Sequence, residues 1–509
     1  MRSARLGAAA IVAASLAGCS LAPPYSIPPS PAAAAYKELG PQGQGPWQPA
    51  ATDTSLPTAW WTTFDDPTLT ALEARIEAGN PDLASAVARY DQARGLLGES
   101  RAALLPSISV GADGGRSRVS AGRPLSPGNA ATYNNLSVGA SLAYEIDLFG
   151  RVRNSVRADA ASAQASAQDV VAVRLALQAS LADSYFQMRG LDARTVLLRQ
   201  TVTAFQRAYD LTDTRHTGGI ASGIDVSRSA ALLSSARAEL SAVAGARAAF
   251  EHSIAALVGE TPSTFAIPVV DTLQRPPAIP VGVPSTLLQR RPDIVAAERR
   301  IAAANAQIGV ARAAQYPSLT LGGSGGFEAG NGNILRASNS FWALGPLSAA
   351  LAIFDGGARK ARVRISRAQY DEAAASYRST VLTAFREVED DLARSRALVA
   401  QERDQLAATR AAERTRDLAL IRYRDGASDY LDVVTAQTAA LDAQRLLLEV
   451  QSTRLQIAVD TVRAIGGGIL PLDRPYRVPR SRGRSRSFAR AGGSRTRPAG
   501  RDPSRRTHA

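Results

Sequence analysis

Larger apolar side chains between Ala358 and Asp425 recur in steps of seven and four residues. The stretch contains neither proline nor glycine, and this spacing is typical of a coiled-coil seam. It predicts one helix, about 100 Å long at a rise of about 1.5 Å per residue. The matching stretch from Arg151 to Thr217, interrupted only by Gly190, predicts a second long helix. The apolar positions of the seam are Tyr370, Tyr377, Val381, Val388, Leu392, Val399 and Leu406.

Between the proline-free stretches, short segments alternate apolar with small or polar residues, the pattern of a β-strand. The fourth segment changes phase at Gly345-Pro346, which predicts a bulge or kink. Glycine- and asparagine-rich sequence joins the segments in pairs, so we expect one β-hairpin near 105–147 and another near 317–354. The alternating segments are Ile108–Val110, Val138–Ile146, Leu319–Leu321 and Phe341–Ile353.

The chain contains one structural unit twice. Asn80-Pro-Asp-Leu83 is matched 211 positions later by Arg291-Pro-Asp-Ile294. Gly219 and Asp225 are matched 207 positions later by Gly426 and Asp432. The length difference must fall in the hairpin, so the first copy has the longer hairpin loop. Such self-similarity indicates a repeat architecture.

Four strands in one chain cannot close a membrane sheet. Unpaired edges cannot be satisfied in lipid, so membrane strands must form a closed barrel. Two copies would give about eight strands, whose side chains fill the interior, whereas three copies would give about twelve strands and a lumen. The small residues on one face of the predicted strands favour the open barrel, and therefore a trimer.

The N-terminus has the pattern of a secretory signal. Arg2 and Arg5 precede an apolar run, Leu6 to Ala17, that is too short to span a bilayer. The run ends in Leu16-Ala17-Gly18-Cys19, which resembles the bacterial lipobox, and Cys19 is the only cysteine of the chain. We therefore expect lipidation at Cys19, and Ser20 after it favours sorting to the outer membrane.

The net charge of +14 is mostly local. From Pro471 to the end, twelve arginines face two aspartates. This tail has neither apolar periodicity nor aromatic residues interleaved with the charges, so we interpret it as a disordered, solvated extension and expect no nucleic-acid partner. The expected segments are a signal peptide at 1–18, a lipidated linker at 19–57, a first repeat at 58–262 with long helices at 150–258, a linker at 263–284, a second repeat at 285–470 with long helices at 357–466, and the tail at 471–509.

Several motifs in this order resemble the TolC-type outer-membrane factor family, in particular the lipoprotein branch that serves multidrug (RND-type) efflux systems. The resemblance covers approximately residues 57 to 470. The motifs are Trp60-Trp61-Thr-Thr-Phe64-Asp-Asp-Pro67, Asn80-Pro-Asp-Leu83, Asp147-Leu-Phe-Gly150-Arg151, Ile353-Phe-Asp-Gly-Gly357, and Tyr423-Arg-Asp-Gly426 before Tyr430-Leu-Asp432-Val.

The resemblance implies a mainly α fold with membrane β structure: a homotrimer whose 12-stranded β-barrel continues into an α-helical barrel. It further implies an outer-membrane exit duct that passively carries small molecules from a periplasmic adaptor and an inner-membrane RND-type pump, with no cofactor. Two alternatives stay open: a type I protein-secretion exit duct, and a periplasmic coiled-coil scaffold or adaptor without a channel.

Glycines mark where the long helices must reverse. Gly218 and Gly219 in the first copy and Gly426 in the second are competent for turns. Asp225 and Asp432 follow at equal offsets. Each can serve as an acid at a helix start, an explanation that fits Asp432 less well because its helix is expected to begin near Ser428.

The alternative is a periplasmic gate, since each aspartate becomes a ring of three carboxylates in a trimer. The resemblance implies that Asp225, Tyr423 and Asp432 help to hold the entrance closed. Two positions depart from the family pattern: Ser428 replaces an arginine and Thr435 replaces an acid. Arg215, Arg422 or Arg424 are therefore candidates for the missing cation.

Little in the sequence favours an enzyme. The three histidines, His216, His252 and His508, form no spaced metal or nucleophile set. We expect no catalytic or metal site. The identity of the transported substrate is not encoded in these patterns.

Overall fold

The computed structural model describes residues 20–29, 35–39, 57–122, 128–280, 290–330 and 332–468. The chain divides into two units, Met1–Pro475 and Tyr476–Ala509, and all described residues belong to the first. The expected lipidation residue Cys19, the signal peptide and the Arg-rich tail at 471–509 lie outside the described residues.

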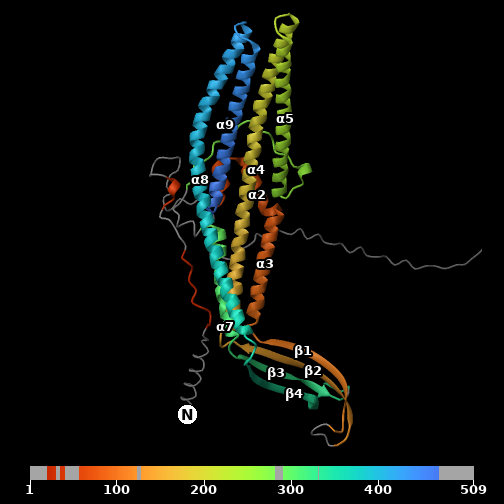
Figure 1. The fold of residues 1–509 in the computed structure, drawn as a ribbon. Helices are drawn as coiled ribbons and strands as arrows, with labels where there is room; N and C mark the ends of the chain where they lie inside the picture. The colour runs from red at the N-terminus through yellow and green to blue at the C-terminus, as the bar shows by residue number, and fades with distance from the viewer. Residues whose placement is uncertain are drawn as a thin grey trace, which may run out of the picture. The chain divides into compact units, whose positions relative to one another are not determined.

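Three helices of the first copy have counterparts of equal length in the second (Figure 1). α4 (Arg151–Thr217) and α8 (Ala358–Arg424) each contain 67 residues. α5 (Gly223–Leu257) and α9 (Tyr430–Ala464) each contain 35 residues, and α3 (Pro81–Ala102) and α7 (Pro292–Ala313) each contain 22. The short helix α2 (Pro67–Gly79) precedes α3. The described residues also form four 3₁₀ turns, Lys37–Leu39, Trp60–Phe64, Pro262–Thr264 and Ala337–Asn339.

Local chemistry fixes the helix starts. Asp66 and Asn80 accept hydrogen bonds from the first free backbone N–H groups of α2 and α3, as side chains at the N-cap do. Proline stands at the first position of both helices, where its missing N–H costs nothing. Asn80 also donates to the carbonyl of Leu257 at 2.8 Å, which ties the start of α3 to the end of α5.

The seam predicted along α8 is buried in its middle. Tyr377, Val381, Val388 and Leu392 are at most 5% exposed, while Tyr370, Val399 and Leu406 are half-buried. α8 packs along α9, as α4 packs along α5, and α4 also contacts α7 and α9. Gly190, within α4, permits a close approach to α9, since a Cβ there would lie 2.7 Å from Ser452 Oγ.

The four strands form one antiparallel sheet in chain order: β1 (Ser107–Val119), β2 (Ala131–Ile146), β3 (Ser318–Ala329) and β4 (Ser340–Ala350). The sheet lies at the end of the long helices opposite to the turns between α4 and α5 and between α8 and α9 (Figure 1). Within the described residues, β1 and β4 each pair on one side only, so both edges of the sheet are open in a single protomer.

The predicted irregularity in the fourth strand is confirmed. The register of β3 and β4 shifts between Leu321 and Gly323, which leaves Gly345 and Pro346 on β4 opposite a single residue. The expected end of this strand at Ile353 is wrong, because β4 ends at Ala350. The two glycines that precede α8, Gly356 and Gly357, both have positive φ values, so the chain turns toward the helix in this segment.

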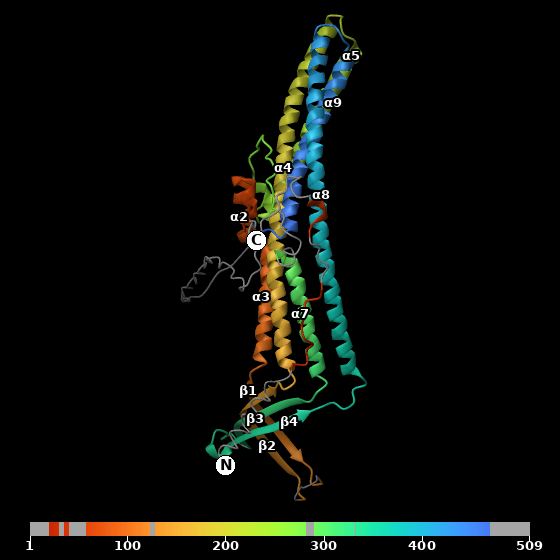
Figure 2. The same cartoon turned by 90° about the vertical axis from the view of Figure 1, so that its left-hand side faces the viewer.

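Part of the N-terminal segment lies along α7 and α8 (Figure 2). Asn305 on α7 donates to the carbonyl of Pro23 at 2.9 Å. The Glu389 carboxylate on α8 accepts from the backbone N–H groups of Lys37 and Glu38 at 2.8 and 3.0 Å. Ser20 donates to Asn154, in the first turn of α4, at 3.0 Å. The segment is thus held at several points by polar contacts, and its Tyr36 side chain is 6% exposed.

None of the described helices combines the length and the apolar character that a membrane-spanning helix requires.

Candidate functional site

The two helix reversals have the same backbone geometry. Gly218 follows the last residue of α4 as its C-cap, and Gly219 has a φ of 76°. In the second copy Gly426 has a φ of 78°. Positive φ is readily adopted only by glycine, so these positions end α4 and α8 as the sequence predicts.

The helices after both turns also begin alike. Ser222 is the N-cap of α5 and forms a capping box with Asp225, in which each residue's side chain serves the other's backbone N–H. Asp429 is the N-cap of α9 and accepts from the backbone N–H of Asp432 at 3.1 Å. The expected helix start near Ser428 is therefore wrong: α9 begins at Tyr430, and Asp432 lies in its first turn like Asp225.

The two aspartate side chains nevertheless differ. The Asp225 carboxylate accepts from Ser222 Oγ at 2.7 Å and lies 3.9 Å from Arg228. The Asp432 side chain is exposed and has no hydrogen-bond or ion-pair partner among the described residues. The Asp225 carboxylate is thus occupied in capping its own helix, whereas that of Asp432 remains available to a group outside the protomer.

An aromatic cluster joins the two helical turns, one between α4 and α5 and the other between α8 and α9, which we call the hairpin ends. Tyr423 and Tyr430 are 7% and 2% exposed, and their ring centroids lie 5.2 Å apart. Tyr430 lies against Ser229 on α5 and Thr212 on α4, so it links the second copy to the first. Tyr430 was not among the predicted gate residues. The repeat nevertheless marks it as a point where the copies differ, because its counterpart in the first copy is Gly223.

Arg215, one of three candidate cations, makes the second link. From the last turn of α4 it donates to the carbonyls of Tyr423 at 2.9 Å and Arg424 at 2.8 Å. Its guanidinium also lies 4.6 Å from the centroid of the Tyr423 ring. These carbonyls belong to the C-terminal end of α8, which attracts cations because its last carbonyls lack helical partners.

The other predicted gate positions make only local contacts. Arg422 donates to Ala427 in its own turn at 3.3 Å, and Arg424 pairs with the adjacent Asp425 at 3.1 Å. Thr435 donates to the carbonyl of Leu431 one turn earlier at 2.9 Å. Ser428 Oγ is buried and has no hydrogen-bond partner in the described part of the chain. Of the three arginines, Arg215 alone therefore bridges the two copies in the described residues.

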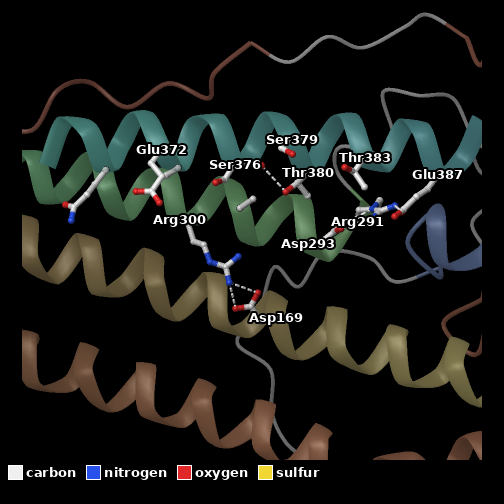
Figure 3. Close-up of a pocket in the computed structure, with 13 residues that line it drawn as sticks. Asp169, Arg291, Asp293, Arg300, Glu372, Ser376, Ser379, Thr380, Thr383 and Glu387 are labelled. Carbon is white, nitrogen blue, oxygen red and sulfur yellow. Dashed lines mark hydrogen bonds and ion pairs between the residues drawn. The ribbon is translucent and has the colours of Figure 1, made fainter. Parts of the chain in front are cut away.

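A polar cavity of about 650 Å³ lies between α4, α7 and α8 (Figure 3). Arg300 on α7 donates to both carboxylate oxygens of Asp169 on α4, at 2.6 and 2.8 Å, and Arg291 donates to Glu387 on α8 at 2.6 Å. Ligand pockets are mostly apolar, so this lining suits water and ions better. The α8 side carries four hydroxyl side chains, Ser376, Ser379, Thr380 and Thr383.

Within the described ranges, no group of three or more His, Cys, Asp or Glu side chains is arranged to hold a metal ion.

Comparisons with known proteins agree with this architecture. Residues 73–260 and 283–467 match the family described as outer membrane efflux protein. The outer membrane protein OprJ of Pseudomonas aeruginosa is 34% identical over 476 residues, which cover 92% of this chain and 97% of OprJ. TtgC of Pseudomonas putida, described as a probable efflux pump outer membrane protein, is 33% identical over 462 residues, which cover 90% of this chain and 94% of TtgC.

Solved structures give the same result. The outer-membrane channel OprN matches with a TM-score of 0.82 and 30% identity, covering 88% of this chain and 99% of OprN. The similarities confirm the predicted fold, the function as an outer-membrane efflux channel and the outer-membrane location. The chain belongs to the outer membrane efflux protein family.

Proposed function

We propose that three copies of this chain form the passive exit duct of a tripartite efflux system. The observation that carries the assembly is the open sheet, in which β1 and β4 each lack a partner on one side among the residues that the structure describes. Strand edges in a membrane must pair, and three four-stranded sheets joined edge to edge give about twelve strands, enough for a lumen. The polar cavity between α4, α7 and α8 is compatible with a hydrated conduit wall.

Outer-membrane fractionation and heat-modifiable migration test the assembly. Unheated protein should migrate as a trimer and heated protein as a monomer. A soluble monomer recovered from the periplasm would contradict the duct and favour the coiled-coil scaffold.

The hairpin ends supply the surface for the partners that this function requires, a periplasmic adaptor and an inner-membrane RND-type pump. Apolar side chains are exposed there in both copies, most of all Ile220, which is 79% exposed. Exposed apolar patches mark interaction sites more often than chance. Photo-cross-linkers placed at Gly219 and Gly426 should capture the adaptor. The exposed apolar residues are Ile220, Ile224, Leu418, Ile421 and Leu431.

We assign the periplasmic gate to Asp432, with Tyr423 and Asp225 as supporting residues. In a trimer, the available Asp432 carboxylate becomes a ring of three negative charges, which narrows the bore and selects cations. Asp432→Ala should raise the single-channel conductance in a planar bilayer. Asp442→Ala, which removes an exposed aspartate paired with Arg445 at 3.3 Å, is the control. Equal conductance of the Asp432 variant and the wild type would remove Asp432 from the gate.

We assign the membrane anchor to acylated Cys19. The neighbouring residue Ser20 is bonded to Asn154 near the strand–helix junction, which is consistent with an anchor at the inner surface of the outer membrane. Cys19→Ser should abolish labelling by radioactive palmitate, and labelling that persists would contradict the assignment. The duct itself is passive and the partner pump supplies the energy for transport. The chain therefore needs no catalytic residue and no cofactor for this function.

A further inference from the structure

We propose that Arg215 is the positioning residue that holds the α8/α9 end of each protomer against the α4/α5 end and thereby keeps the gate closed. The inference rests on the gate proposed above. It identifies which of the three candidate arginines, Arg215, Arg422 or Arg424, supports that gate. Its basis is the set of contacts that cross between the two copies of the repeat at the hairpin ends.

Arg215 crosses from the first copy to the second by contacting the end of α8. The two carbonyls that Arg215 reaches, those of Tyr423 and Arg424, are consecutive in the last turn of α8. A guanidinium presents several N–H donors in a rigid fork, so a single side chain serves both carbonyls and also stacks on the Tyr423 ring at 4.6 Å. Displacing the end of α8 from α4 must break all three contacts together.

The second copy contains an arginine that corresponds to Arg215 but makes a different contact. Arg422 occupies the position in α8 that Arg215 occupies in α4, since both lie four residues before the turn glycine. Arg422 instead donates to Ala427 in its own turn. The crossing contact is therefore a property of Arg215 and does not follow from an arginine at the end of a long helix.

Two buried hydroxyl groups near the end of α8 make no hydrogen bond to the first copy. The hydroxyls of Tyr423 and Ser428 are both buried, and neither has a hydrogen-bond partner among the described residues. Tyr423 is thus held through its ring and its backbone carbonyl, and Arg215 contacts both. Because Asp432 follows Tyr423 closely on the same hairpin, fixing Tyr423 also fixes where the Asp432 carboxylate lies.

Planar-bilayer recordings of Arg215→Ala and of the repeat-matched control Arg422→Ala test the inference. The Arg215 variant should spend a larger fraction of time open, on the order of a hundredfold or more, as expected when two hydrogen bonds from a charged donor are lost. The Arg422 variant should behave as the wild type. Both should keep the heat-modifiable trimer band, which separates a gating effect from a loss of assembly.

Arg215→Lys provides the conservative variant. A lysine keeps the charge but lacks the planar fork, so its open fraction should lie between those of the wild type and Arg215→Ala. If the alanine variant does not assemble, the lysine variant decides the question by the same measurement. An open fraction equal to the wild type in the assembled Arg215 variants, or an equal increase in Arg422→Ala, would overturn the inference. A wild-type chain that forms no channel at all would instead overturn the proposed function.

Discussion

Replacing Asp391 by asparagine should stabilise the protein at alkaline pH and leave its stability unchanged at acid pH. Asp391 lies on α8 and is 6% exposed. Burial, and then the charge of Asp460 on α9, raise its pKa to about 7, while Arg394 and Arg463 act in the opposite direction. Asp183 on α4 also faces Asp460, and its pKa is raised to about 7 for the same two reasons. The other charged group that acts on Asp391 is Glu387.

The size of the effect follows from proton linkage. The carboxyl has a pKa of 3.8 in its ordinary state and about 7 in the folded protein. As the pH rises between these values, the unfolded chain releases its proton while the folded chain retains it, so folding loses about 1.4 kcal/mol per pH unit. The loss reaches about 4 kcal/mol above pH 7 and is absent below about pH 4. Asparagine cannot titrate, so it removes this loss while keeping nearly the same shape.

Thermal unfolding followed by circular dichroism measures the difference. At an unfolding entropy of about 2 cal/mol/K per residue, about 4 kcal/mol raises the melting temperature of a chain of this size by about 4 °C. The increase should appear at pH 8 and vanish at pH 4. Asp390→Asn, the same change at the adjacent exposed residue, should alter neither value. An equal shift at both pH values, or a lower melting temperature at pH 8, would refute the reasoning.

Three further changes have defined outcomes. The Glu73 carboxylate is fully buried and has no hydrogen-bond partner within the described ranges. Burial raises its pKa, so Glu73→Gln should raise the melting temperature more at pH 8 than at pH 4. Gly259→Ala should destabilise the protein by at least about 2 kcal/mol in thermal unfolding, because Gly259 has a φ of 75° and a Cβ there would lie 2.0 Å from the Gly79 carbonyl oxygen. Truncation after Pro471 should leave the trimer band and the melting temperature unchanged, and a lost trimer would give the tail a structural role.

Local rules predicted most of the elements. The absence of proline and glycine located α8 to within one residue of its observed end, and glycine with positive φ located both turns. The start of α9 was misplaced because Ser428 and Asp429 are adjacent residues of equal competence as N-caps. Local preference cannot choose between them, whereas the burial of Tyr430 against α4 and α5 can.

Contacts between distant segments were beyond the sequence patterns. Tyr25 donates to Glu298, which lies 273 positions later, and nothing in the periodicity of either segment marks the pair. The sequence indicates Arg215 as one of three candidate arginines. Which of the three bridges the two copies depends on which backbone carbonyls lie within hydrogen-bond distance of each guanidinium. Such contacts depend on how whole helices are placed, and a single chain read in order contains no direct signal for this.

The equal lengths of α4 and α8 also constrain how the protein can be resized. Removing one heptad from α8 alone would shorten it by about 10 Å and withdraw Tyr423 from Arg215. Removing the corresponding heptad from α4 as well would shift both ends together and preserve their contact. The two long helices must therefore keep equal lengths, and insertions or deletions are tolerated only when they are made in both copies. The length of the duct across the periplasm can change only when α4 and α8 change together.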